Sequence, residues 1–486
     1  MGVVIKQSIS NTLILVIGFG IGAINTLILY THFLSETYYG LITFLLSTAN
    51  ILMPLMIFGM HHAMIKFYSS YKNADSFLTT SLWLPLVIII PISLLFSLFY
   101  NQISLWISKE NSLIYDYTFY ILLLGICMGY FELFFAWSRV QMKSVFGMFV
   151  REVFARLGAF ILLFALYFSL ISPHEFILAM VVVYVLRMLI MMTYALRLYR
   201  PKWKWEVPEN FKEILKYGAY IILAGSAGTI LLEIDKFMIP QVKELGEVAF
   251  YGVGIYIASV VGIPSRAMQQ IVNPLTASAI NQKEDQKVKD LYKKVSLNLL
   301  IIGGLLFLWI NLGVQQIYQI IDNPKFEAGI PIVLIISIAE LYKLFNGNAN
   351  TVLTNSKYYR FFFYTAVGMA VLVVALNHLW IPKLGISGAA YATLTVVLLF
   401  GTIKMVFLRV KMNLKVALSP TWITLAIIGL LYFVFSSQNW FLEFNPWIGL
   451  TLQSILIAIT YIGLVYLLKL STDLNLILNK FLLKRK

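Results

Sequence analysis

Long apolar stretches alternate with short polar ones along almost the whole chain of 486 residues. A helix needs about 20 mainly apolar residues to cross the hydrocarbon of a bilayer, and only helices or closed barrels satisfy their backbone hydrogen bonds there. The pattern predicts an all-α polytopic membrane protein with about 14 transmembrane helices. We expect them over residues 11–33, 39–61, 78–100, 113–138, 148–170, 175–198, 214–239, 249–272, 294–316, 328–351, 359–380, 387–409, 417–436 and 447–469.

The overall composition supports a membrane protein. Hydrophobic residues make up 60% of the chain and charged residues only 12%. Soluble globular proteins contain about 25% charged residues, so a water-soluble fold of this size would lack the polar surface to cover its core. Soluble enzymes and disordered proteins are therefore excluded as interpretations, and the spans leave no room for a separate soluble domain.

The excess of positive charge indicates an orientation in the membrane. The chain has 37 Lys and Arg against 22 Asp and Glu. With the N-terminus inside, 30 of the 37 cations fall on the cytoplasmic side and four on the other, while Arg187, Lys236 and Lys343 lie within spans. This asymmetry follows the positive-inside rule. It predicts that both termini are cytoplasmic, and it makes a nucleic-acid partner unnecessary.

The longest polar segments suggest where the chain divides. Residues 199–213 contain two prolines and a basic, aromatic cluster between the sixth and seventh spans. We expect six-helix lobes at 1–198 and 214–409, a linker at 199–213, and two additional helices with a tail at 410–486. Three residues recur 211 or 212 positions later in the chain: Glu36, Tyr39 and Gly40 correspond to Glu247, Tyr251 and Gly252. Either a parallel internal repeat or chance similarity explains this recurrence.

Ionisable residues inside spans are the main candidates for a functional site, because a charge is costly in lipid unless it faces a cavity or a partner. Arg187 lies near the middle of the sixth span, too far from either interface to reach water easily, and its own span offers no acid. Glu340 and Lys343 lie one helical turn apart in the tenth span. They either neutralise each other or form part of a cationic, hydrated cavity wall.

Two further sets of charges fall within spans. Glu233, Asp235 and Lys236 lie close to the outer end of the seventh span, and Glu132 lies about two turns from the inner end of the fourth. Lys236 either extends towards the interface or takes part in a site. Asp235 or Glu233 is then a candidate proton or cation site, with Glu132 a weaker one.

Motifs for catalysis and metal binding are missing from the sequence. There is no phosphate-binding loop of the G-x-x-x-x-G-K-[ST] type, no H-E-x-x-H pair and no nucleophile paired with a base. The only cysteine, Cys127, excludes an intramolecular disulfide and a cysteine-based metal site. We therefore expect a protein that is not an enzyme and has no metal or organic cofactor.

Three segments resemble a known family. Lys6, Ser8 and Thr12 precede GFGIGAINTLILYTHFLSETYYGLITF (18–44), which looks like the opening of Wzx-like polysaccharide flippases of the MOP superfamily. EIDKFMIPQVKELGEVAFYGVGIY (233–256) and PKLGISGAAYAT (382–393) resemble later motifs of that family in the same order. The resemblance implies two MATE-like six-helix lobes with alternating access, in the inner membrane of a bacterium. Fourteen-helix members of the family are known.

The resemblance also implies a substrate, a polyprenyl-pyrophosphate-linked oligosaccharide moved from the inner to the outer leaflet. We expect the phosphates and sugars to contact Arg187, Lys343 and Lys236, and Arg151, Arg156 and Arg266 to assist entry from the inner leaflet. Glu340, Asp235, Glu233 and Glu132 are candidates for coupling to H+ or Na+ or for balancing the cations. Membrane lipid and other polysaccharide-assembly membrane proteins are the expected partners of a monomer.

Three alternatives remain open from the sequence. A lipid II flippase differs only in the head group of its substrate. A drug or cation antiporter of the MATE type is expected to carry unpaired acids in its cavity, where this chain has cations at least as prominent. A membrane polysaccharide polymerase or ligase is expected to have a large outer loop, which the predicted topology lacks.

Overall fold

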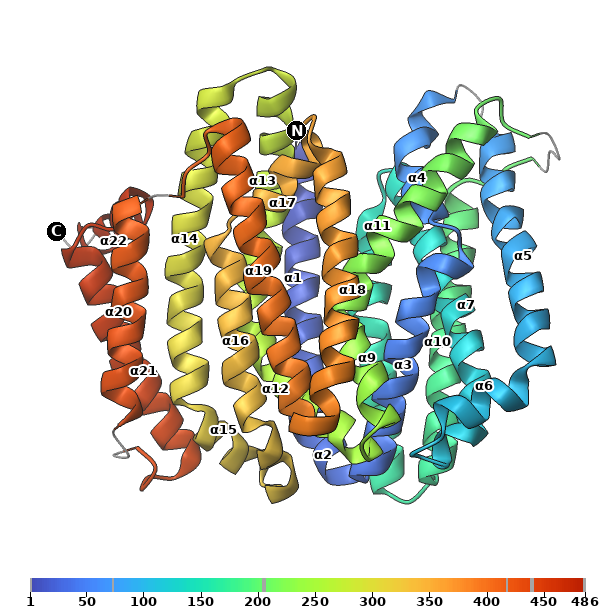
Figure 1. The fold of residues 1–486 in the computed structure, drawn as a ribbon, viewed down its shortest axis with the longest axis horizontal. Helices are drawn as coiled ribbons and strands as arrows, with labels where there is room; N and C mark the ends of the chain where they lie inside the picture. Colours follow the sequence, from blue (N-terminus) through green and yellow to red (C-terminus); the bar gives the residue numbers. More distant parts are fainter. Residues whose placement is uncertain (1, 72–73, 203–206, 417, 438–440, 484–486) are drawn as a thin grey trace. The chain divides into compact units, whose positions relative to one another are not determined.

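The computed structural model describes residues 2–71, 74–202, 207–416, 418–437 and 441–483, and every regular element in these ranges is a helix (Figure 1). Twelve described helices are long and apolar enough to cross a membrane, and a bent helix over Phe211–Ile222 and Ala227–Gln241 makes thirteen if it counts as one span. The predicted all-α, polytopic fold class is confirmed. Most helix boundaries differ from the predicted ones by a few residues, and the helix predicted over 294–316 begins earlier, at Asp285.

The remaining predicted span, 148–170, is helical but unusually charged. It consists of α8 (Ser144–Phe149), the π-helix η3 (Val150–Phe154) and α9 (Ala155–Tyr167), which follow one another without a break. Every stretch of 18 residues within it contains Arg151, Glu152 and Arg156. Three charges in one span are too costly to face lipid, so the side chains need polar surroundings inside the protein.

The described chain packs into two compact units. Unit 1 comprises Met1–Gly252 and Asn377–Ile386, and unit 2 comprises Val253–Leu376 and Ser387–Lys486. The predicted linker at 199–213 includes residues 203–206, which lie outside the described residues. The lobe boundaries proposed from the sequence remain a prediction.

Most of unit 1 is built from the first twelve α-helices, and α12 continues into unit 2. Its elements are α1 (Gly2–Ile24), η1 (Asn25–Leu29), α2 (Tyr30–Phe33), α3 (Glu36–Met56), α4 (Met60–Phe67), η2 (Tyr68–Ser70), α5 (Asp75–Leu98), α6 (Tyr100–Ile107), α7 (Leu113–Val140), α8, η3, α9, α10 (Pro173–Leu198), α11 (Phe211–Met238), η4 (Ile239–Gln241) and α12 (Leu245–Ala258). Helix α7 forms the centre, because it packs against α3, α4 and α10.

Unit 2 contains the remaining elements, except for the end of α18, which belongs to unit 1. They are η5 (Ser259–Gly262), α13 (Ile263–Asn281), α14 (Asp285–Leu312), α15 (Val314–Ile321), η6 (Pro324–Gly329), α16 (Ile330–Phe345), α17 (Ala349–Asn355), α18 (Tyr359–Leu384), α19 (Ile386–Met412), α20 (Leu418–Ser436), α21 (Pro446–Leu467) and α22 (Thr472–Leu483). Helix α14 packs against α13, α16, α20 and α21. The two predicted C-terminal spans correspond to α20 and α21.

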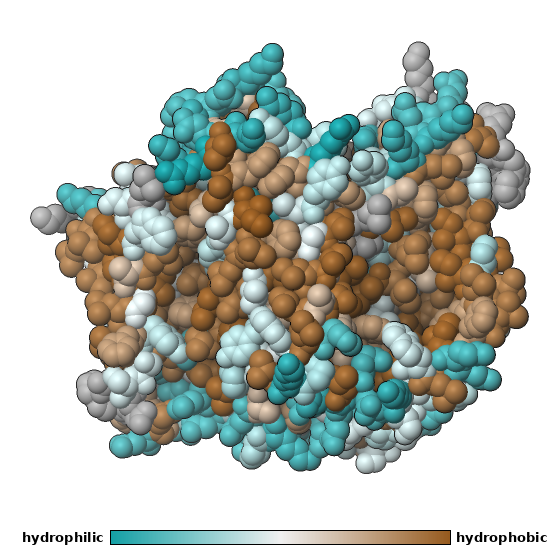
Figure 2. Space-filling view, viewed as in Figure 1, coloured by the Kyte–Doolittle hydropathy of each residue, from teal (hydrophilic) through white to brown (hydrophobic). Residues whose placement is uncertain are grey.

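Large apolar side chains cover the middle of the helices, while polar ones gather at the helix ends (Figure 2). On α5, Val87, Ile90 and Leu94 are 55%, 63% and 60% exposed, and on α20 Phe433 is 76% exposed. Water-soluble proteins rarely expose contiguous apolar surface on this scale. The exposed faces are therefore the surfaces that contact lipid.

Candidate functional site

A polar cavity of about 190 Å³ lies within unit 1. Its walls come from α3, α7, the π-helix η3, α9 and α10. The side chains that line it are Asn50, Met53, Met128, Phe131, Glu132, Arg151, Glu152, Arg156, Tyr184 and Arg187. Three arginines against two glutamates give this arginine pocket a net charge of +1 when all five groups are ionised.

The arginine pocket brings together four residues that the sequence singled out separately. Arg187 comes from α10, Glu132 from α7, and Arg151 and Arg156 from the charged fifth segment. From the sequence, Arg187 and Glu132 were expected inside membrane spans. Arg151 and Arg156 were expected to assist entry from the inner leaflet. The structure places all four around one cavity.

A cap fixes the start of the helix that carries Arg187. Ser172 Oγ accepts a hydrogen bond from the Glu175 backbone N–H at 3.3 Å, and the Ser172 N–H donates to Glu175 Oε2 at 2.7 Å. Pro173 occupies the first turn, where no N–H is needed. This capping box stabilises the start of α10, which packs on α7, where Arg187 lies over Phe131.

The helix that carries Arg151 and Glu152 has a local π-helical turn, η3. Such turns widen a helix and occur often at functional sites. Helix α1 is close beside it, because a Cβ at Gly18 would lie 2.6 Å from the Glu152 carbonyl oxygen. Asn25, in the second π-helical turn η1, donates to the Arg156 carbonyl oxygen at 2.7 Å. The first span therefore holds the backbone of the arginine-bearing helix.

Ion pairs hold two of the three arginines. Arg151 Nε lies 3.5 Å from Glu132 Oε1 and 3.7 Å from Glu152 Oε1, and Arg156 Nη1 lies 2.9 Å from Glu152 Oε2. The side chains of Glu132 and Glu152 are 17% and 21% exposed. Both carboxylates are thus engaged by arginines.

Arg187 has a different environment. Among the described residues, no carboxylate lies within ion-pair distance of its guanidinium. The guanidinium carbon lies 3.9 Å from the centre of the Phe131 ring and 5.5 Å from that of Tyr184. Its Nη2 donates to the Arg151 carbonyl oxygen at 3.4 Å, and its buried Nε has no acceptor. Aromatic faces stabilise this cation without neutralising it, so it retains its charge and its donors for an anion.

The charges predicted near the outer end of the seventh span form an ion pair on α11. Lys236 Nζ lies 2.7 Å from Glu233 Oε2, and both side chains are less than a fifth exposed. Asn50, which also lines the arginine pocket, donates to Glu233 Oε1 at 3.3 Å. Lys236 is therefore paired inside unit 1, and Asn50 connects the pair to the pocket.

Asp235 lies beside that pair but has other neighbours. It is 2% exposed and accepts hydrogen bonds from the Tyr251 hydroxyl and, at 2.7 Å, from Asn377 Nδ2. Asn377 is fully buried, and its Oδ1 has no hydrogen-bond partner. A buried carboxylate thus lies next to an amide whose oxygen is unused.

The two predicted charges of the tenth span pair with each other in unit 2. Lys343 Nζ lies 2.7 Å from Glu340 Oε1, with side chains 35% and 19% exposed. The carboxylate packs against the backbone of η5, since a Cβ at Gly262 would lie 2.6 Å from Glu340 Oε2. The structure thus shows the neutralised arrangement of the two considered from the sequence. Arg266, on α13, is exposed and forms no ion pair among the described residues.

Sequence reasoning missed four residues that matter here. Glu152 was overlooked because it lies between two arginines that were assigned to the inner flank of a span, and Tyr184 because tyrosine is common in membrane helices. Asn50 carries no charge. Lys404 was assigned to orientation, but it is only 7% exposed, and its Nζ donates to Asn350 Oδ1 at 3.1 Å with no carboxylate in reach in the described ranges. The available signal was a lysine more than one turn inside the predicted span 387–409.

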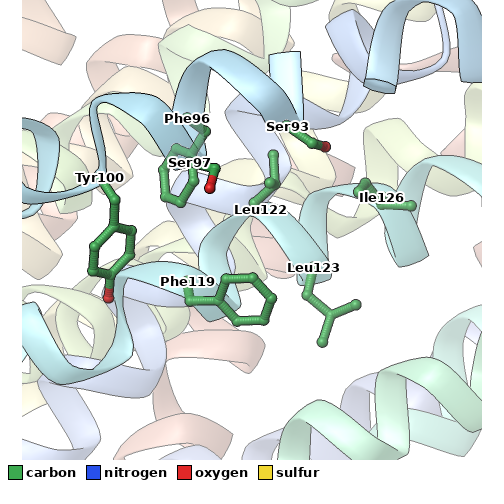
Figure 3. A pocket seen from close by; sticks show the side chains of 8 residues that line it. All are labelled: Ser93, Phe96, Ser97, Tyr100, Phe119, Leu122, Leu123 and Ile126. Atoms are coloured by element: carbon green, nitrogen blue, oxygen red, sulfur yellow. The ribbon is translucent and has the colours of Figure 1, made fainter. Parts of the chain in front are cut away.

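A larger, apolar pocket of about 290 Å³ lies elsewhere in unit 1. Figure 3 shows that its side chains come from the end of α5, from α6 and from α7, with Phe96 and Phe119 among them. None of its lining residues is charged, and two serines and a tyrosine are its only polar members. Because none of the predicted site residues lines it, the arginine pocket remains the candidate functional site.

Comparisons with known proteins identify the family of the chain. The model of a family described as "Polysaccharide biosynthesis protein" matches residues 4–280, which is more than half of the chain and includes all residues of the arginine pocket. No curated protein sequence matches the chain.

Solved structures resemble the fold at low sequence identity. The structure titled "Lipid II flippase MurJ, inward closed conformation" matches with a TM-score of 0.67 and 13% identity, over 95% of this chain and 99% of that one. An inward-facing multidrug resistance MATE family transporter of the MOP superfamily matches with a TM-score of 0.58 and 13% identity, over 84% of this chain and 94% of that one. A MOP superfamily transporter from Pyrococcus furiosus, whose title reports a binding pocket of reverse polarity, matches with a TM-score of 0.54 and 13% identity, over 84% and 96%.

These family members and structural neighbours are transporters and flippases. The chain is therefore a multi-pass membrane protein of the polysaccharide biosynthesis protein family, with the fold of the MOP superfamily.

Proposed function

We propose that this protein flips an oligosaccharide linked through a pyrophosphate to a polyprenyl lipid, from the inner to the outer leaflet of a bacterial inner membrane. The family is one of polysaccharide biosynthesis, and its fold is shared by a lipid II flippase. A diphosphate that carries sugars cannot enter hydrocarbon alone, so a protein must offer it a polar, positively charged path.

The observation that carries the proposal is the uncompensated charge of Arg187 in the arginine pocket. A guanidinium presents its N–H donors in a planar fork that binds phosphate oxygens in pairs, and this geometry suits a diphosphate better than an ammonium does. Arg151 and Arg156 lie around the same cavity, so we assign them direct phosphate contacts as well.

Glu132 and Glu152 give the pocket a moderate affinity rather than a maximal one. Their ion pairs with Arg151 and Arg156 keep these arginines in place and reduce the net charge of the pocket to +1. A transporter must release its cargo, and a site with three unpaired arginines would hold a diphosphate too tightly. We therefore assign both glutamates to charge balance.

The size of the cavity fits this division of roles. Pockets that enclose a drug-sized molecule measure about 300–1,000 Å³, whereas the arginine pocket measures about 190 Å³. It suits the charged head of the substrate and is too small for a whole oligosaccharide. Lys236 and Lys343 remain proposed contacts for phosphate or sugar, although each is paired with a glutamate, and the exposed Arg266 suits the entry role proposed for it.

We assign coupling to H+ or Na+ to Asp235. Its carboxylate is buried, and the unused Oδ1 of Asn377 lies on the amide that donates to it. Carboxylate and amide oxygens are ligands for hard cations, and a buried carboxylate is also a proton acceptor. Glu340, Glu233 and Glu132 form ion pairs with Lys343, Lys236 and Arg151, and we assign them to charge balance.

A lipid II flippase is the second candidate, favoured by the fold shared with MurJ. Its substrate carries the same kind of diphosphate, so the arginine pocket is equally compatible with both candidate functions. The net positive pocket disfavours export of drugs that are cations, and no motif supports a polymerase or ligase. We further propose that the protein acts as a monomer with both termini in the cytoplasm, alongside other polysaccharide-assembly membrane proteins.

Flipping by purified protein in liposomes tests this proposal. Three fluorescent probes are compared: a polyprenyl-diphosphate oligosaccharide, lipid II and a lipophilic cationic dye. We expect the first probe to lose its inner-leaflet protection from a membrane-impermeant quencher fastest. Faster movement of lipid II would establish the second candidate, and movement of the dye alone would overturn both.

A further inference from the structure

A second polar pocket, of about 200 Å³, lies within unit 2 and has a different chemistry from the arginine pocket. It is formed where α14, α15, α20 and α21 end or begin. Its lining residues, which we call the amide pocket, are Asn311, Leu312, Val314, Gln315, Gln316, Tyr432, Phe435, Ser436, Phe441, Leu442 and Gln453. None of them is charged, and four carry a side-chain amide.

Hydrogen bonds between the buried amides hold their side chains in fixed positions around the pocket. Gln316 Nε2 donates to Gln453 Oε1 at 2.8 Å, and Gln453 Nε2 donates to the Leu312 carbonyl oxygen at 3.1 Å. Gln316 and Gln453 are 2% and 5% exposed. Buried amides in an apolar bundle are costly unless they are satisfied, so such a chain of them needs a reason.

Two amide oxygens of this pocket lack hydrogen-bond partners. Asn311 is 7% exposed, and its Nδ2 donates to the Phe307 carbonyl oxygen at 2.9 Å while its Oδ1 accepts nothing. Gln316 Oε1 is also without a donor. Both residues line the pocket, and each oxygen still has the capacity to accept a hydrogen bond from a ligand bound there.

The lining favours one class of ligand. Side-chain amides both donate and accept hydrogen bonds, as sugar hydroxyls do, and Tyr432, Phe435 and Phe441 add flat apolar surfaces beside them. An anion would find no cation here, and an apolar tail would leave the amides unsatisfied. We propose that the amide pocket binds one or two sugar units of a neutral glycan.

This inference rests on the proposed function and extends it. Under the predicted topology, α14 and α20 end on the outer side, so the amide pocket would hold sugars that have reached that side. The diphosphate and the sugars of one substrate class would thus be recognised by separate pockets, one charged and one neutral.

Cysteine protection tests the proposal. Gln315 lines the amide pocket and is exposed, whereas Gln319 is exposed one turn further along α15 and does not line it. The native cysteine, Cys127, is buried and gives a low background. Gln315→Cys and Gln319→Cys are labelled in detergent with a maleimide dye, with and without lipid-free oligosaccharide released by mild acid from the lipid-linked precursors of the host.

We expect the oligosaccharide to slow labelling at position 315 several-fold and to leave position 319 unchanged. Inorganic phosphate should protect neither, and Gln453→Leu in the Gln315→Cys protein should remove the protection. Equal protection at both positions, protection by phosphate, or no protection by the oligosaccharide would overturn the proposal. The probe carries no lipid or diphosphate, so this failure differs from a failure to flip the lipid-linked substrate.

Discussion

The guanidinium of Arg187 lies over the ring of Phe131, 3.9 Å from the ring centre, and no carboxylate is within ion-pair distance of it in the described part of the chain. Arg187 comes from α10 and Phe131 from α7, so the contact joins two helices that pack together. The pair leaves the positive charge of Arg187 available to an anion while fixing its position.

Loss of the Phe131 ring should loosen Arg187. A cation–π contact contributes about 0.5–2 kcal/mol, so we expect Phe131→Leu to weaken binding of undecaprenyl diphosphate by roughly 2- to 30-fold. Binding to detergent-purified protein measures this. Phe134→Leu, one turn along α7 and outside the pocket, is the control and should bind normally. Equal loss in both variants would assign the effect to general damage of α7.

Removal of a balancing charge should act in the opposite direction. Glu132→Gln removes the nearer of the two carboxylates that pair with Arg151 and raises the net charge of the arginine pocket from +1 to +2. We expect tighter binding of undecaprenyl diphosphate and a steeper dependence on salt, because more of the attraction is then electrostatic. Glu284→Gln is the control, because Glu284 pairs with Lys287 outside the pocket. It should change neither the affinity for undecaprenyl diphosphate nor its salt dependence. Weaker binding by Glu132→Gln would contradict the assigned role.

The buried lysine of unit 2 should be dispensable for stability. Among the described residues, Lys404 has one oxygen acceptor, Asn350 Oδ1, with the Met369 sulfur 3.7 Å away. Replacing a poorly compensated buried charge by an apolar group of similar length is often neutral or stabilising. We expect the thermal unfolding midpoint of Lys404→Met in detergent to equal or exceed that of the parent. A clearly lower midpoint would show that the ammonium has a partner that stabilises the fold.

Two glycines should differ sharply in their tolerance of a methyl group. A Cβ at Gly40 would lie 1.8 Å from the Leu245 carbonyl oxygen, whereas one at Gly252 would make only an ordinary contact of 3.7 Å with Thr43. Overpacking costs about 1–3 kcal/mol, and a clash with backbone costs more because little can move aside. We expect Gly40→Ala to lower the unfolding midpoint by several degrees and Gly252→Ala to leave it nearly unchanged. Similar midpoints for the two variants would refute the tight helix contact.

Hydrophobic patterning predicted the helical fold and nearly all spans, because the length of an apolar run is a local property of the sequence. The charged fifth segment shows where that approach fails: Arg151, Glu152 and Arg156 belong to one cavity only because α7 and α10 bring Glu132 and Arg187 to them. Pairing across helices depends on packing, which one sequence does not reveal. For the same reason Glu340 and Lys343 could be placed on one face, but their neutralisation was one of two open readings.

The neutral pocket was missed for a related reason. Asn311, Gln316 and Gln453 are isolated polar residues in apolar surroundings, and each alone is unremarkable in a membrane helix. Only the approach of α15 to α21 joins them. Charge draws attention in a hydrophobic sequence, whereas a scattered set of amides does not.

We propose that the uncompensated charge of Arg187 binds the diphosphate of the substrate. The rate at which a fluorescent polyprenyl-diphosphate oligosaccharide is flipped in liposomes depends on this contact. We predict that Arg187→Gln abolishes flipping while its unfolding midpoint stays close to that of the parent, that Arg187→Lys retains part of the rate, and that Arg197→Gln, at an exposed arginine of α10 outside the pocket, stays close to the parent. Full activity of a folded Arg187→Gln protein would contradict the account.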